Sequence, residues 1–169
     1  LLLDRSGSML DDDKWGQAQR ALEGSILPTS ERLRFGVLTF PWGMSCGVSP
    51  EALRVPVGEL SAEALGALFT EALPVDTALT PLAGAIDQGR ELLNALGDRN
   101  RRGVLILLTD GVETCADGGA PNSEAPRFAA EEAVADGYTL YTIGFGSLVS
   151  QRTLRELAEL GGTGRERRA

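Results

Sequence analysis

The chain contains no histidine and only two cysteines, Cys46 and Cys115, among its 169 residues. The absence of histidine excludes a Ser-His-Asp triad, a Cys-His nucleophile and every zinc site that needs an imidazole ligand. No apolar run approaches the roughly 18 residues that a membrane-spanning helix needs. Basic residues are outnumbered by acidic ones, and the formal net charge of −8 argues against nucleic-acid binding, which requires a basic face.

What is present is an ordinary globular composition, with 43% hydrophobic and 24% charged residues. A chain of this length can form one domain with a sizeable core but is too short for two comfortable domains. We therefore predict a single domain over residues 1–169. Only three residues precede Asp4, fewer than a buried strand normally has. We expect both ends to be trimmed, which leaves room for a signal peptide, an anchor or further domains outside this segment.

Short apolar segments alternate with helical patterns along the chain. Strands are expected at residues 1–3, 33–40, 103–109 and 138–145, with an edge strand at 53–57, which contains Pro56. Helices are expected at residues 13–27, 61–73, 80–96, 125–135 and 150–160. This alternation predicts an α/β fold with a doubly wound, mostly parallel central sheet, helices on both faces and one short antiparallel edge strand.

Small oxygen-bearing residues follow the ends of the expected central strands. The first strand runs into "DRSGS" (residues 4–8), the 103–109 strand runs into Asp110, and the 80–96 helix begins at Thr80. Ligands of a doubly wound sheet bind beyond the carboxyl ends of its strands, so these groups are expected to meet. Oxygen ligands without sulfur or imidazole select Mg²⁺, with Mn²⁺ or Ca²⁺ as alternatives. The predicted metal ligands are Asp4, Ser6, Ser8, Thr80 and Asp110.

The mixture of ligands indicates what such a site does. Hydroxyl groups bring no formal charge, so a cation that they contact directly stays electrophilic. Carboxylates held behind bound waters would fix those waters and balance the charge. Octahedral Mg²⁺ would keep one position for an outside oxygen, and an Asp or Glu carboxylate of a partner protein is its natural occupant. The pattern predicts a binding device without catalytic residues.

Three segments, "DRSGSM", Thr80-Pro81 and "LLTDG", resemble in their order the von Willebrand factor type A (VWA) domain with its metal-ion-dependent adhesion site (MIDAS). The pattern of that family is Asp-x-Ser-x-Ser, a later Thr and a later Asp-Gly. "YTIGFG" and "LAELGGT" are similar to the closing strand and helix of the family. The resemblance implies a Rossmann-like VWA fold, a MIDAS cation at the five residues above and a role in adhesion.

The chain departs from the family in two places. The family usually has glycine before its threonine, whereas this chain has "TALT", so Thr77 is a rival to Thr80 as the ligand. The last strand of the family, after "GGT", is expected to be missing. Asp11, Asp12 and Asp13 are interpreted as the acidic N-terminus of a helix. A second cation site at Asp11 and Asp12, similar to that of integrin β-subunit domains, is the alternative.

The two cysteines follow strands that end at the same edge of the predicted sheet. We hypothesise a Cys46–Cys115 disulfide and hence an oxidising compartment, extracellular or periplasmic. Closing a loop of about 70 residues would stabilise the fold by roughly 4 kcal/mol in the chain-entropy model. Two free thiols in a cytosolic protein are the alternative.

Two rival functions stand beside metal-dependent adhesion. One is an accessory VWA subunit that assembles with an ATPase, as the resemblance allows. The other is a metal-assisted hydrolase, although the chain lacks an Asp-x-Asp nucleophile loop, a Gly-x-Ser-x-Gly elbow and a P-loop.

Overall fold

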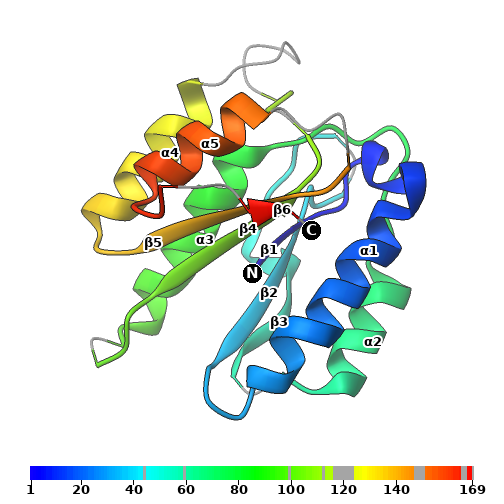
Figure 1. Cartoon of the computed structure of the whole chain (residues 1–169), viewed down its shortest axis with the longest axis horizontal. Coiled ribbons are helices and arrows are strands. Elements are labelled where there is room, and N and C mark those ends of the chain that lie inside the picture. Colours follow the sequence, from blue (N-terminus) through cyan, green and yellow to red (C-terminus); the bar gives the residue numbers. More distant parts are fainter. Residues whose placement is uncertain are drawn as a thin grey trace.

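The structure, a computed structural model, describes residues 1–43, 45–58, 60–98, 100–111, 113–115, 124–146 and 151–164, together with the backbone of 167–168. Its centre is one sheet with the strand order β3-β2-β1-β4-β5-β6 (Figure 1). The strands are β1 (Leu2–Asp4), β2 (Phe35–Phe40), β3 (Leu53–Gly58), β4 (Val104–Thr109), β5 (Thr139–Gly144) and β6 (Arg167–Arg168).

The sheet is parallel except at one edge. Strand β1 pairs in parallel with both β2 and β4, and β4 pairs in parallel with β5. Among the strands of the described residues, only β3 runs antiparallel, beside β2. The chain therefore leaves β1 toward one side of the sheet and reaches β4 on the other side. The carboxyl ends of β1 and β4 form the switch point at which doubly wound sheets bind ligands.

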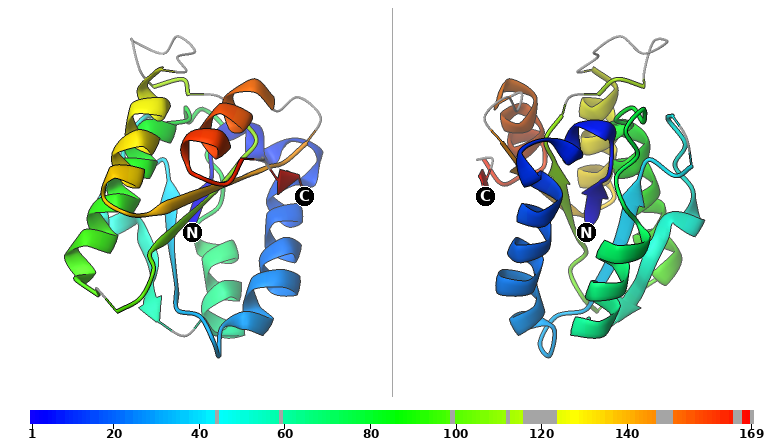
Figure 2. Two further views of the ribbon diagram at one scale, coloured as in Figure 1. Left: turned by 60° about the vertical axis from the view of Figure 1, so that its left-hand side comes forward. Right: turned by 90° about the vertical axis from the view of Figure 1, so that its right-hand side faces the viewer.

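Helices cover both faces of the sheet (Figures 1 and 2). The helices are α1 (Lys14–Ala21), α2 (Ala62–Glu71), α3 (Leu82–Leu96), α4 (Glu124–Ala135) and α5 (Gln151–Leu160). Helices α1 and α2 share one apolar core, to which β1 contributes Leu3. Helices α3, α4 and α5 share the other core, to which β1 contributes Leu2. Successive residues of one short strand thus anchor both layers.

The α/β class, the mostly parallel sheet, the antiparallel edge strand and the helices on both faces confirm the fold predicted from the sequence. The central strands read as apolar runs because helices cover them on both sides. No helix in the described part of the chain is long and apolar enough to span a membrane.

Three details of the sequence prediction were wrong. The expected α3 start at Thr80 is displaced to Leu82, because a residue before proline is driven away from helical conformation. A short strand, β6, does follow "GGT" and pairs in parallel with β5. The helix expected at residues 125–135 begins one residue earlier, at Glu124. Residues 116–123, which precede this helix, lie outside the described residues.

Candidate cation site

Asp4, the last residue of β1, is fully buried at the carboxyl edge of the sheet. Its Oδ1 accepts a hydrogen bond from the Ser6 backbone N–H at 2.8 Å. Its Oδ2 accepts one from the Thr109 hydroxyl at 2.5 Å. Burial raises the pKa of Asp4 to about 7, although the hydrogen bonds from Thr109 and Ser6 act in the opposite direction. Both carboxylate oxygens are therefore held by neutral donors.

The two serines connect Asp4 to the end of β4. The Ser6 and Ser8 hydroxyl oxygens lie 3.2 Å apart. The Ser8 hydroxyl donates to Asp110 Oδ1 at 2.7 Å. Ser6 is buried, and so is Asp110. The structure thus brings four of the five predicted ligands into one hydrogen-bonded chain across the β1–β4 switch point.

Thr80, the fifth predicted ligand, lies against the same cluster. A Cβ atom added to Gly111 would lie 3.3 Å from the Thr80 hydroxyl oxygen, so this hydroxyl adjoins the backbone that follows Asp110. The Thr80 hydroxyl has no hydrogen-bond partner among the residues that the structure describes. The rival Thr77 is exposed, whereas Thr80 is buried. The placement favours Thr80.

Glycine at position 7 lets the segment before Thr80 approach the first motif. A side chain at Gly7 would collide with the carbonyl oxygen of Asp76. The Gly7 N–H donates to the Ala78 carbonyl at 3.2 Å, and the Val75 N–H donates to the Arg5 carbonyl at 3.0 Å. The glycine between the two serines therefore allows a close backbone contact. This contact places the segment that leads to Thr80 beside the cluster.

Lys14, the first residue of α1, places an ammonium group in the cluster. Its Nζ donates to Asp110 Oδ2 at 2.5 Å and to the Ser8 carbonyl at 3.0 Å. The side chains of Lys14 and Asp110 are only 8% and 2% exposed. Both oxygens of Asp110 are therefore engaged, one by a hydroxyl and one by a buried cation.

Two further cationic groups lie near the end of β1. Arg5 directly follows Asp4, and its buried Nε has no hydrogen-bond partner among the described residues. Burial lowers the pKa of Arg5, and repulsion from Arg54 lowers it further. The Arg54 guanidinium lies 4.6 Å from the ring centroid of Trp42.

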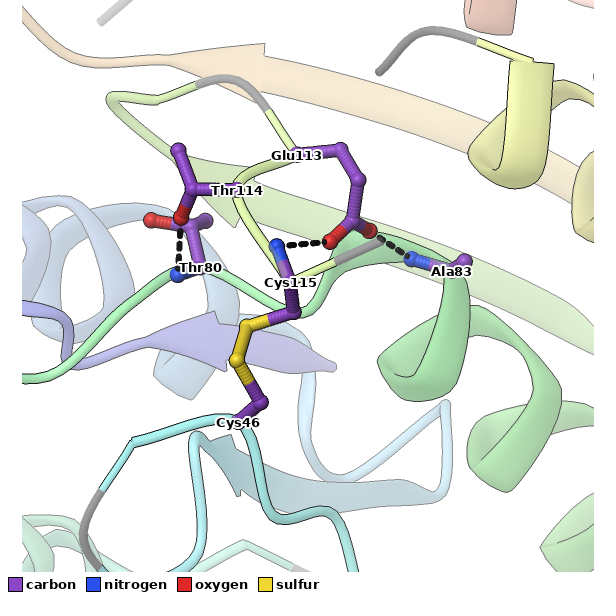
Figure 3. The surroundings of a disulfide bond; sticks show 6 residues. All are labelled: Cys46, Thr80, Ala83, Glu113, Thr114 and Cys115. Carbon is purple, nitrogen blue, oxygen red and sulfur yellow. Dashed lines mark hydrogen bonds between the residues drawn. A yellow bond between two sulfur atoms is a disulfide. The ribbon is translucent and has the colours of Figure 1, made fainter. Parts of the chain in front are cut away.

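The segment after Asp110 is fastened to the start of α3 (Figure 3). The buried Glu113 carboxylate accepts hydrogen bonds from Cys115 N–H at 2.7 Å and from Ala83 N–H, in the first turn of α3, at 2.8 Å. The Thr80 N–H donates to the Thr114 hydroxyl at 2.8 Å, and the Thr114 N–H donates to the Thr80 carbonyl at 3.1 Å. These bonds fix Thr80 relative to β4.

Cys46 and Cys115 form the disulfide that the sequence suggested, across 69 residues (Figure 3). It joins the loop between β2 and β3 to the segment that follows Asp110.

The three aspartates before α1 lie outside this cluster. Asp11, Asp12 and Asp13 are exposed, and Asp13 is the residue that precedes the helix. Asp13 forms an exposed ion pair with Arg20 at 2.8 Å. Asp12 and Asp13 both have positive φ angles. Asp13 directly precedes α1, but its side chain makes no capping hydrogen bond.

The donor set fits a hard cation. Within the described residues, no group of three or more Asp, Glu, Cys or His side chains is arranged to hold a metal ion. The cluster instead combines two carboxylates with the hydroxyls of Ser6, Ser8 and Thr80. Because the oxygens of Asp4 and Asp110 already accept protein hydrogen bonds, the hydroxyl oxygens are the groups best placed for direct contact.

Sequence reasoning missed three residues of this site: Lys14, Thr109 and Glu113. Lys14 follows three aspartates and looks like part of a charged helix start. Its partner Asp110 is 96 residues away, and no local spacing signals that pairing. Thr109 precedes Asp110 within an apolar strand, and only the strand pairing brings its hydroxyl to Asp4.

The fold and this edge define a doubly wound α/β protein with an oxygen-rich cluster at its switch point. The family model of the von Willebrand factor type A domain matches residues 1–168. The chain belongs to that family. No curated protein matches the sequence significantly.

Several solved structures share the fold. BatB from Bacteroides thetaiotaomicron, a conserved hypothetical protein, is 18% identical, with a TM-score of 0.69 over 99% of this chain and 87% of BatB. Proximal thread matrix protein 1 from the mussel byssus, with a zinc-occupied MIDAS motif, is 22% identical (TM-score 0.68, covering 96% and 41%). Manganese-loaded TRAP protein of Plasmodium vivax is 18% identical (TM-score 0.64, covering 94% and 60%). The chain spans less than two thirds of the latter two proteins.

Proposed function

We propose that this chain is a non-catalytic VWA domain that binds a protein partner through a divalent cation. The cation would be held by Asp4, Ser6, Ser8, Thr80 and Asp110. The observation that carries this proposal is the meeting of these five residues from three segments at the switch point, with Asp4, Ser6, Ser8 and Asp110 linked directly. A cation bound there would supply a Lewis-acidic position for an anionic oxygen.

The chemistry of the ligands favours Mg²⁺, with Mn²⁺ or Ca²⁺ as alternatives, since all of them are oxygens. Ser6, Ser8 and Thr80 offer hydroxyls without charge, so the cation would remain attractive to an outside carboxylate. An Asp or Glu side chain of the partner is the expected ligand. Two basic groups, Arg5 after β1 and Arg54 on β3, suit a partner surface that is itself acidic.

A binding role agrees better with the geometry than hydrolysis does. A general base needs a carboxylate oxygen within reach of a substrate water, whereas the oxygens of both site carboxylates accept hydrogen bonds from the protein. Among the structural relatives, the SpaC protein of Lactobacillus rhamnosus GG is a pilus adhesin. That name supports adhesion by analogy of fold.

The disulfide supports an extracellular or periplasmic location, because such bonds persist in oxidising compartments. We propose that residues 1–169 act there as one VWA domain. Its position at a cell surface would place the candidate cation where Mg²⁺ and protein partners are both available.

Calorimetric titration with Mg²⁺ and with Mn²⁺ tests the proposal. We expect saturable binding by the wild type, lost in Asp110→Ala and in Ser6→Ala. Asp98→Ala is the matched control, because Asp98 also pairs with one basic residue, Arg101 at 2.5 Å, but belongs to the turn between α3 and β4. Loss of binding in Asp98→Ala, or equal binding by wild type and Asp110→Ala, would contradict the proposed site.

A carboxylate probe tests the second half of the proposal. Acetate added to the Mn²⁺-loaded protein should displace a metal-bound water and lower the paramagnetic relaxation of the solvent protons. The same acetate series with the Ser6→Ala variant should leave the relaxation unchanged. Tight Mn²⁺ binding without any acetate effect would leave a cation site but refute carboxylate capture.

A further inference from the structure

The Lys14 ammonium group lies inside the candidate cation site, where its positive charge would repel a bound cation. Lys14 Nζ contacts Asp110 Oδ2 and the Ser8 carbonyl, and the Lys14 side chain is almost completely buried. Its aliphatic part passes against the turn after β5, where a Cβ at Gly146 would lie 2.9 Å from Lys14 Cε. The ammonium is held in place by two hydrogen bonds and by packing.

A comparison with Arg20 shows that the Lys14–Asp110 pair differs from an ordinary surface ion pair. Arg20 lies on the same helix and pairs with Asp13, but both side chains are about two thirds exposed, at 64% and 67%. Exposed pairs are screened by water and contribute little. Burying an ammonium, by contrast, carries a desolvation penalty that hydrophobic replacements avoid. An apolar side chain of similar length would fill the same space without that penalty.

The charge balance of the site shows what the ammonium changes. Asp4 and Asp110 together carry two negative charges when they face a cation, and Lys14 contributes one positive charge. The group of these three side chains is then singly negative. With a divalent cation bound it becomes singly positive, whereas without Lys14 it would be neutral. Only the positive site attracts a further carboxylate through net charge.

We propose that Lys14 is a positioning residue that keeps the cation-loaded site positive, so that the site captures a partner carboxylate at the expense of its affinity for the cation alone. This inference rests on the proposed function. Lys14 acts through Asp110, whose second oxygen it holds, and through the Ser8 carbonyl, which orients the loop that carries the Ser8 hydroxyl.

The test compares Lys14→Met, Lys14→Gln and the control Arg20→Met. Methionine removes the charge and the donors, glutamine removes the charge but keeps an N–H donor, and Arg20→Met removes a charge from the exposed side of α1. Two affinities are measured for each protein: that for Mn²⁺, by calorimetry, and that of the Mn²⁺-loaded protein for acetate, by solvent proton relaxation. Thermal unfolding checks that each variant is folded.

Both charge-removing variants should bind Mn²⁺ at least about tenfold more tightly than the wild type, because a unit charge a few ångströms away changes binding by that much or more. Their affinity for acetate should fall by about tenfold for the same reason. Arg20→Met should match the wild type in both affinities. Agreement between methionine and glutamine would assign the effect to charge and not to the lost hydrogen bonds.

The outcomes separate this inference from the proposed function. If the wild type binds Mn²⁺ and acetate but folded Lys14→Met and Lys14→Gln bind both as the wild type does, the role of Lys14 is refuted and the function stands. Weaker Mn²⁺ binding by both variants would assign Lys14 a purely structural role. If only the variants bind Mn²⁺, the ammonium replaces the cation in the native protein, and both proposals fail.

Discussion

The two halves of the candidate site are built differently. In the β1 half, Asp4 is held by two neutral donors, the Ser6 N–H and the Thr109 hydroxyl. In the β4 half, Asp110 is held by the charged Lys14 as well as by a hydroxyl. The segment after Asp110 is also joined to the rest of the chain by the Cys46–Cys115 disulfide. A substitution in the β1 half removes a hydrogen bond to a neutral group. A substitution in the β4 half leaves a buried charge without its partner.

This difference teaches that two aspartates of one motif need not be equivalent. Burial among neutral donors raises the pKa of Asp4 to about 7, since burial disfavours the charged form. Asp110 has an ammonium as its partner, so the removal of either partner leaves the other charged and buried. The halves should therefore respond differently to substitution.

The largest effect is expected from the covalent link of the β4 half. The double variant Cys46→Ala/Cys115→Ala should lower the free energy of unfolding by about 4 kcal/mol, because the unfolded chain regains the freedom of a loop of nearly 70 residues. Urea unfolding measures the loss. The wild type in a reducing agent should show the same loss, and a loss below about 1 kcal/mol would show that the disulfide contributes little.

The predicted difference between the two halves of the site is tested by Asp110→Asn and Asp4→Asn. Asp110→Asn should lower the free energy of unfolding by about 3 kcal/mol, because it leaves the Lys14 ammonium buried without its carboxylate. Asp4→Asn should cost about 1 kcal/mol, since it disturbs only hydrogen bonds to neutral groups. Urea unfolding without metal ions measures both.

Adding Lys14→Met to Asp110→Asn should recover more than half of the loss, because the second change removes the unbalanced charge. The same addition to Asp4→Asn should bring no comparable recovery. Equal losses in the two asparagine variants would show that the halves are held in the same way.

The smallest effect on stability is expected at the third segment of the site. Thr80→Val should change the free energy of unfolding by less than about 0.5 kcal/mol, because the Thr80 hydroxyl has no partner among the described residues. It should nevertheless weaken Mn²⁺ binding by about tenfold, the loss expected for one direct or supporting ligand. Thr77→Val, at the exposed rival position, should change neither quantity. If Mn²⁺ binding were weaker in Thr77→Val but not in Thr80→Val, Thr77 and not Thr80 would be the ligand.

Most of the fold follows from local patterns in the sequence. The strands that end at Phe40 and Thr109 were expected from short apolar runs, and the edge strand from Pro56, which cannot donate in a central ladder. The start of α3 differs from the prediction because Pro81 disfavours helical conformation at Thr80, so the helix begins only at Leu82. Strand β6 carries two arginines and no apolar signal, so only its pairing with β5 reveals it.

The candidate site was predictable to a lesser degree. The motif names the ligand types, and the order of strands and helices implies that they share one edge. The supporting contacts are long-range: Lys14 to Asp110 spans 96 residues and Glu113 to Ala83 spans 30. A pattern confined to a few neighbouring residues carries no information about which distant side chain will lie beside it.

The sequence by itself determined the layers of this protein, because apolar periodicity reports which face of a strand or helix is buried. It also determined that oxygens would gather at the carboxyl edge. Only the tertiary structure decided the electrostatics of that edge: a buried ammonium beside Asp110, neutral donors around Asp4 and a Thr80 hydroxyl that has no partner among the described residues. The reason is that charge interactions depend on distance and burial, and both arise only when separate segments of the chain meet.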